Sequence, residues 1–135
     1  IISASLYFMN FIDAVKSYFV KWNDFKTRSS RSEYWWATLF STLASIVSQL
    51  VNAAIASNPS ALTLTIAILI LILLIFMFIA SLALVVRRLH DLDKSGWWYL
   101  LIFTIIGIIP LIIWYCSKGT EGQNRFGEDP LSERF

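Results

Sequence analysis

The residues best suited to chemistry lie together at positions 87–98, in the stretch RRLHDLDKSGWW. This stretch holds the only histidine of the chain, His90, which is followed by Asp91 and then by Asp93. Imidazole and carboxylate groups serve as metal ligands, or as a general base with the acid that orients it. A metal site or an acid–base centre is therefore the first chemistry that these residue types suggest.

The rest of the sequence does not complete either kind of site. A metal site usually needs three or four protein ligands, but there is no second histidine and no carboxylate in the long apolar tracts. The single cysteine, Cys116, excludes an internal disulfide and argues against a cysteine-based zinc site. Because His90 and Asp91 are adjacent, their side chains diverge on a helix or a strand. We therefore expect no catalytic residue, no metal, no cofactor and no enzymatic activity.

The distribution of charge indicates what surrounds this stretch. No charged residue lies between Glu33 and Arg87, and none lies between Lys94 and Lys118. The chain is 57% hydrophobic and 15% charged, whereas soluble domains carry about a quarter charged residues. A helix needs about 20 apolar residues to cross about 30 Å of hydrocarbon. The tracts predict a membrane protein, and the net charge of +2 gives no indication of nucleic acid as a partner.

Turn signals and aromatic residues divide the two tracts into three predicted transmembrane helices. Asn58 and Pro59 mark a turn, which separates a helix at 35–55 from a helix at 62–86. The second tract predicts a third helix at 97–116. Tryptophan and tyrosine residues at the ends of these segments are typical of the aromatic belts at membrane interfaces.

The segments outside the spans complete a single-domain, all-α membrane protein. Within residues 6–25, large apolar residues recur at helical spacing and charged or polar residues fill the opposite face. This pattern predicts an amphipathic interfacial helix before the transmembrane helices. Packing of the apolar face on the bundle explains it equally well. Ser30 and Glu33 have the spacing of a capping box. Residues 117–135 form a polar tail. The chain starts without methionine, so Met9 is a candidate start, and no signal peptide is recognisable.

Positive charges predict the sidedness. Five Lys and Arg residues precede the first span, three follow the second and three lie in the tail, out of eleven in all. With three crossings, eight share a side with the N-terminus, and the positive-inside rule makes that side cytoplasmic. Gly107 and Pro110 leave an alternative in which 97–116 dips into the membrane and returns. A crossing is the favoured expectation, because neighbouring helices tolerate a proline in a membrane helix.

A membrane-surface site is a second interpretation of the 87–98 stretch. In either topology, basic and aromatic residues meet at one membrane surface, which suits anionic lipid headgroups or an acidic protein partner. Ordinary topology signalling needs the same charges and explains them without specific binding. The candidate surface consists of Arg28, Arg31, Arg87, Arg88, His90, Asp91, Lys94, Trp97 and Trp98.

Two further polar features complete the set of candidates. In the tail, Asn124 and Arg125 are expected either to fold back on the bundle or to meet a partner. Within the first span, Gln49 and Asn52 lie on one helical face and predict interhelical hydrogen bonds. The spans contain no ionisable residue, which weighs against an ion-coupled transporter.

Four stretches in order resemble a known family: FKTRSSRSEYWW at 25–36, the uncharged tract, RRLHDLDKSGWW, and GTEGQNRFGEDP at 119–130. From about Met9 onward the chain is similar to the YhaH/YhaI-like small bacterial inner-membrane proteins, known as domain of unknown function 805. Thr27 stands where family members commonly have glycine, and Glu128 where they often have proline. The resemblance implies a multi-pass protein of the bacterial inner membrane and no particular activity, because none is established for the family.

These observations predict a non-enzymatic membrane interaction or envelope-associated protein with a cytoplasmic N-terminus. Its cytoplasmic face is expected to bind anionic lipid or a protein partner, and a homo-oligomer is a further expectation. The alternative is a small oligomeric transporter or channel component, in which copies of the chain form a passive path at their interface.

Overall fold

The computed structural model describes residues 9–131, and over that range the chain is helical and contains no strand, which confirms the all-α prediction. Residues 6–8 of the predicted first helix and residues 132–135 of the predicted tail lie outside the described residues. The elements in chain order are α1 (Phe11–Val20), α2 (Arg31–Ala56), α3 (Ala61–Asp91), the 3-10 helix η2 (Gly96–Phe103) and α4 (Ile108–Cys116).

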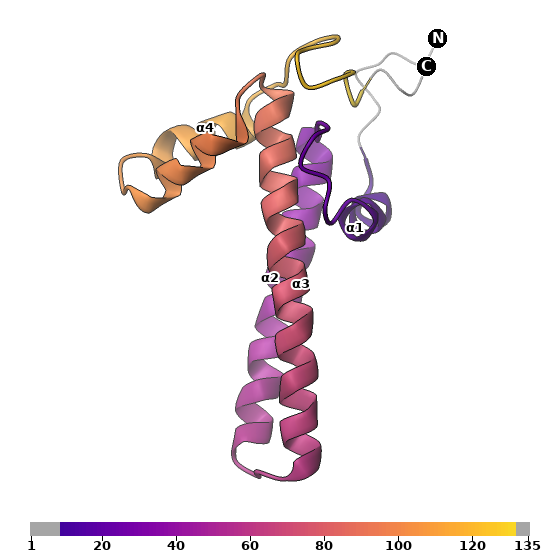
Figure 1. Ribbon diagram of the computed structural model, residues 1–135, viewed down its shortest axis with the longest axis vertical. Helices are drawn as coiled ribbons and strands as arrows, with labels where there is room; N and C mark the ends of the chain where they lie inside the picture. The colour runs from indigo at the N-terminus through magenta and orange to yellow at the C-terminus, as the bar shows by residue number, and fades with distance from the viewer. Residues whose placement is uncertain (1–8, 132–135) are drawn as a thin grey trace.

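Helices α2 and α3 form a long antiparallel pair, which we call the stem (Figure 1). They contain the tracts 35–55 and 62–86, and both are long and apolar enough to cross a membrane. The chain reverses between them at Asn58 and Pro59, as predicted. Ser60 begins α3 with a capping box, because its hydroxyl accepts the Thr63 N–H while the Thr63 hydroxyl accepts the Ser60 N–H.

The predicted third transmembrane helix at 97–116 is not a single helix in the structure. Helices η2 and α4 instead form a hairpin that leaves one end of the stem sideways and returns to it, and we call it the side hairpin (Figure 1). Thr104 ends η2, where its hydroxyl donates to the Leu101 carbonyl (2.9 Å) and accepts the Gly107 N–H (3.0 Å). A Cβ at Gly107 would lie 2.4 Å from the Leu101 oxygen, so this turn requires glycine. Pro110 falls in the first turn of α4, where no backbone donor is needed.

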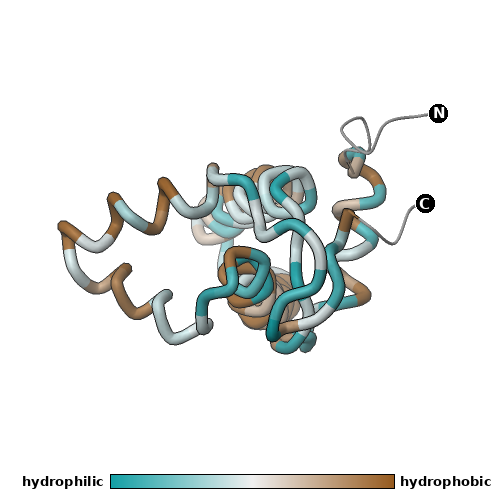
Figure 2. The backbone as a smooth tube through the Cα atoms, turned by 90° about the horizontal axis from the view of Figure 1, so that it is seen from above, coloured by the Kyte–Doolittle hydropathy of each residue, from teal (hydrophilic) through white to brown (hydrophobic). Residues whose placement is uncertain are grey.

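Helix α1 packs across the stem near the same end, on the side opposite the side hairpin (Figure 2). Ala14 and Tyr18 are fully buried there. The Tyr18 hydroxyl lies 2.7 Å from the Met77 carbonyl, to which it donates, and 2.9 Å from the Ser81 hydroxyl. Packing on the bundle, one of the two predicted explanations, is therefore present. Helix α1 is shorter than the predicted 6–25, and its position at a membrane interface stays a prediction.

Candidate functional site

The 87–98 stretch lies where the other elements of the described chain converge, and we call this the charged end of the stem. The segment 21–30, the side hairpin and the tail all meet the end of α3 here, and α1 crosses the stem a few turns away at Met77 and Ser81 (Figure 1). No Lys, Arg, Asp, Glu or His lies from residue 34 to residue 86. The opposite end, formed by the turn 57–60, is consequently uncharged, and we call it the turn end.

Arg87 and Glu33, the two charges that bound the uncharged tract in sequence, are paired in the structure. Their closest atoms, Arg87 Nη2 and Glu33 Oε1, lie 3.4 Å apart, and both side chains are buried. Arg87 Nη1 also donates to the carbonyls of Lys21 (2.7 Å) and Asp24 (3.2 Å), which follow α1. The Ser17 hydroxyl donates to Glu33 at 2.7 Å. This pair therefore ties α1 to both helices of the stem.

Asp91 lies between two buried arginines. Its Oδ2 is 2.5 Å from Arg88 Nη1, and its Oδ1 is 3.0 Å from Arg28 Nη2. Burial raises the pKa of the Asp91 carboxyl, which lies beyond the tract 62–86, and the two guanidinium groups oppose that change. Arg88 also donates to the carbonyls of Tyr115 and Ser117 at the end of α4, where a cation is favourable. The charges thus anchor the side hairpin.

Arg28 joins the same network to the tail. Its Nη1 donates to the carbonyls of Gly122 (2.6 Å) and Gly127 (3.3 Å), and its Nη2 donates to that of Thr120. The Thr120 N–H donates to the Asp91 carbonyl at 2.7 Å. A planar guanidinium group with five donors is suited to this role, because it satisfies several carbonyls and a carboxylate at once.

The candidate tail motif folds back on the bundle, which was one of its two predicted placements. Asn124 Nδ2 donates to the His90 carbonyl at 2.9 Å, and Arg125 Nε lies 3.2 Å from Asp93 Oδ1. The Phe126 ring stacks on the His90 ring with centroids 3.9 Å apart. Burial lowers the pKa of His90, which also lies beyond the tract 62–86. The histidine is therefore an interior packing group under the tail.

The structure divides the nine residues of the predicted surface into two groups. Five are buried and have partners within the chain, so their placement on an open surface is wrong: Arg28, Arg87, Arg88, His90 and Asp91. They are interior groups because the tail, α1 and the side hairpin cover the end of α3. The other four are at least partly exposed, and we call them the rim: Arg31, Lys94, Trp97 and Trp98.

The rim combines positive charge with exposed aromatic rings. Lys94 Nζ lies 4.5 Å from the Trp114 ring centroid, and Arg31 reaches the Cys116 carbonyl at 3.3 Å. Trp97 also lines a groove of about 430 Å³ together with Phe25 and other residues of the charged end. Lipid binding by the rim stays a prediction. Among residues 9–131, no three His, Cys, Asp or Glu side chains are grouped so that they could hold a metal ion.

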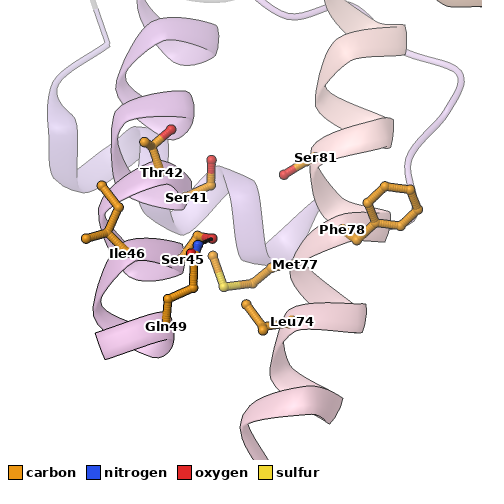
Figure 3. Close-up of a pocket in the computed structure, with 9 residues that line it drawn as sticks. All are labelled: Ser41, Thr42, Ser45, Ile46, Gln49, Leu74, Met77, Phe78 and Ser81. Atoms are coloured by element: carbon orange, nitrogen blue, oxygen red, sulfur yellow. Dashed lines mark hydrogen bonds between the residues drawn. The ribbon is translucent and has the colours of Figure 1, made fainter. Parts of the chain in front are cut away.

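A second polar feature lies halfway along the stem. A pocket of about 440 Å³ opens between α2 and α3, and its polar lining consists of Ser41, Thr42, Ser45, Gln49 and Ser81 (Figure 3). Gln49 donates to Ser45 of its own helix at 3.3 Å. Within one copy of the chain, neither Gln49 nor Asn52 makes an interhelical hydrogen bond among the described residues, so their predicted bonds stay a prediction for contacts between copies.

Sequence reasoning missed the contacts of two residues, Glu33 and Tyr18. Ser30 caps α2 as predicted, since its hydroxyl accepts the Glu33 N–H at 3.3 Å, but the Glu33 carboxylate turns to Arg87 instead of closing a capping box. For Tyr18, the amphipathic pattern of 6–25 indicates an apolar face only, whereas its hydroxyl bonds to Met77 and Ser81. The sequence contains a signal for the pairing of Glu33 with Arg87. These two charges flank the uncharged tract, and a helical hairpin brings the two ends of such a tract together.

Comparison with known proteins identifies a family and relatives that are named inner-membrane proteins. Residues 22–128 match the family described as "Protein of unknown function (DUF805)". "Inner membrane protein YhaI" of Escherichia coli K12 is 34% identical over 107 residues, which cover 78% of this chain and 85% of the relative. "Inner membrane protein YhaH" of the same strain is 34% identical over 114 residues, which cover 81% and 88%. No solved structure matches the chain.

Proposed function

This chain belongs to the DUF805 family, and we propose that it is a bacterial inner-membrane protein with two spans and both ends in the cytoplasm. The spans are 35–55 in α2 and 62–86 in α3. All Lys and Arg residues of the described range lie at the charged end, and the turn 57–60 has none. The positive-inside rule therefore favours a cytoplasmic charged end. The side hairpin starts and finishes at this end, which supports the re-entrant alternative over a third crossing.

Reporter fusions test this topology in cells. A reporter after Phe135 is expected to be active only as a cytoplasmic fusion, and a reporter inserted at Asn58 only as an external one. The first position is decisive, because a third crossing would move the end of the chain to the outside. External activity after Phe135 would overturn the two-span arrangement.

For the charged end we propose a non-enzymatic role, in which the rim binds anionic phospholipid. The observation that carries this proposal is the separation of the charges into a buried set and an exposed set. The buried arginines pair with carboxylates of the chain, whereas Arg31 and Lys94 are at least partly exposed, and Lys94 lies over the half-buried Trp114 ring. Amphipathic rings and cations at one depth suit the headgroup level of an anionic leaflet.

A charge-matched comparison tests lipid binding. Arg31→Gln with Lys94→Gln removes two cations, each worth about 1 kcal/mol near an anionic surface, so the preference for phosphatidylglycerol over phosphatidylcholine should fall roughly 30-fold. The control is Lys118→Gln with Arg125→Gln, which removes two exposed cations that already pair with carboxylates. This control should change the preference for phosphatidylglycerol far less. Lipid retention in native mass spectrometry gives the readout. Equal retention of both lipids by the unmodified protein would contradict the proposal.

The polar pocket supports a second candidate function, a small oligomeric transporter or channel component. Ser45 lies eleven residues after Tyr34, about 16 Å along α2, which is near the middle of about 30 Å of hydrocarbon. Hydroxyl and amide groups at that depth favour a polar partner or a water-filled path. Solute flux into reconstituted vesicles tests it: Gln49→Leu should lower the flux, and Thr65→Val, near the turn end, should not. No flux with the unmodified protein would eliminate this function.

A further inference from the structure

The molecule is much wider at its charged end than at its turn end. Of the described elements, only α2 and α3 reach the turn end, whereas α1 and the side hairpin extend to opposite sides of the charged end (Figures 1 and 2). In the proposed topology, the two halves of the bilayer therefore meet different amounts of protein. The exposed surfaces of α1 and the side hairpin indicate whether these two elements lie in lipid or above it.

The side hairpin has the surface of a lipid-embedded element. It carries no charged residue from 97 to 116, and its tip residues Phe103, Ile105 and Ile106 are 83%, 89% and 81% exposed. Lys94 and Lys118 bracket it at the base, where headgroups would lie. Exposed apolar surface of this extent marks an interaction with a membrane or another protein, and here it continues the apolar surface of the stem. The continuity and the bracketing lysines favour lipid.

Helix α1 has an interfacial pattern on the other side of the stem. Ile12 and Val20 are exposed although apolar, while Asp13 and Lys16 are exposed and charged. Such a helix lies at the boundary between headgroups and acyl chains. Both extra elements therefore occupy the leaflet at the charged end, and neither reaches the opposite leaflet.

The area that the protein occupies in the membrane plane differs by about threefold between the two leaflets. A 3-10 helix of eight residues is about 16 Å long, and a helix is about 10 Å wide, so the side hairpin covers roughly 300 Å² in the membrane plane. Helix α1 covers roughly 150 Å², and the cross-section of the two stem helices is roughly 200 Å². The cytoplasmic leaflet thus accommodates about 650 Å² of protein and the outer leaflet about 200 Å².

We propose that the protein is a leaflet-selective wedge, which accumulates in and promotes membrane that is convex on its charged side. This inference rests on the proposed two-span topology. Inserting α1 and the side hairpin expands only one leaflet. A bilayer that bends so that this leaflet lies on its convex side relieves the difference in area between the two leaflets. The ligand is accordingly a curved bilayer, sensed through lipid packing and not through one headgroup, and amphipathic insertion is known to be sensitive to curvature.

Reconstitution into vesicles of two sizes tests the wedge. The whole chain is mixed with small and large vesicles of phosphatidylethanolamine and phosphatidylglycerol, and the protein-to-lipid ratio and the fraction with the charged end outside are measured. We expect several-fold enrichment in small vesicles, with the charged end outside. Ile105→Asp with Ile106→Asp should abolish the enrichment, because charged residues at the tip keep the side hairpin out of hydrocarbon.

The control is Leu62→Asp, which introduces a similar acid at an exposed apolar position of the turn end and should retain the enrichment. Helical circular dichroism verifies that each variant is folded. Equal ratios in both vesicle sizes would overturn the wedge, as would enrichment that persists in the Ile105/Ile106 variant. The topology fails separately, through external reporter activity after Phe135, so the two proposals are distinguishable.

Discussion

Replacing Asp91 by alanine tests whether the buried charges hold the charged end together. The carboxylate lies 2.5 Å from Arg88 and 3.0 Å from Arg28, and the three side chains are 6%, 0% and 1% exposed. Removing it leaves two guanidinium groups in the interior without their shared anion. Breaking a buried ion pair by deleting one partner typically costs about 3–5 kcal/mol, because the remaining charge stays desolvated. We expect the free energy of unfolding to fall by that amount.

The chain offers a matched control two residues away. Asp93 pairs with Arg125 at 3.2 Å, but these side chains are 49% and 60% exposed. An exposed pair contributes only about 0–1 kcal/mol, and asparagine tolerates the positive φ of this position (56°), so Asp93→Asn should be nearly neutral. Chemical denaturation in detergent micelles, followed by circular dichroism, compares the two variants. If Asp91→Ala lowered the unfolding free energy no more than Asp93→Asn does, the reasoning would be refuted.

Three further perturbations probe the tail, the histidine and the side hairpin. Arg28→Gln removes donors to three tail carbonyls, so tryptic cleavage after Arg125 should become several-fold faster, as followed by mass spectrometry; an unchanged rate would count against this anchor. Because burial lowers the pKa of His90, the unfolded chain binds a proton more readily; stability should fall as the pH drops below about 6.5, and His90→Asn should lose that slope in thermal melts. Gly107→Ala brings a Cβ to within 2.4 Å of the Leu101 carbonyl and should cost about 1–3 kcal/mol by denaturation, whereas a neutral result would show that the turn relaxes freely.

The stem could be predicted because hydrocarbon restricts sequence so strongly. A tract of 53 residues without charge, divided at Asn58 and Pro59, allows little besides two antiparallel helices. The side hairpin could not be decided in the same way. Gly107 and Pro110 are compatible with both a kinked crossing and a return, and the difference depends on local bonds of Thr104 and on attachment of α4 to Arg88.

The sequence predicts where the candidate site lies along the chain and in the membrane helices, but not that its charged side chains are buried. The 87–98 stretch does lie at an end of the stem, yet most of its charges face inward. Sequence patterns give no indication that Arg28 binds tail carbonyls, because backbone acceptors exist at every residue. The pairing of Glu33 with Arg87 was within reach, since the length of the two helices sets their ends side by side.

The contacts between Arg28 and the tail also constrain the order of events during synthesis. Arg28 is synthesised before the carbonyls that accept its hydrogen bonds, because Thr120, Gly122 and Gly127 follow it by 92, 94 and 99 residues. The interior of the charged end consequently stays incomplete until the segment that contains Gly127 has been made. A chain that stops before Thr120 would leave the Arg28 guanidinium group without these carbonyls and the His90 ring without Phe126, so an incomplete copy would expose polar groups that the complete charged end covers.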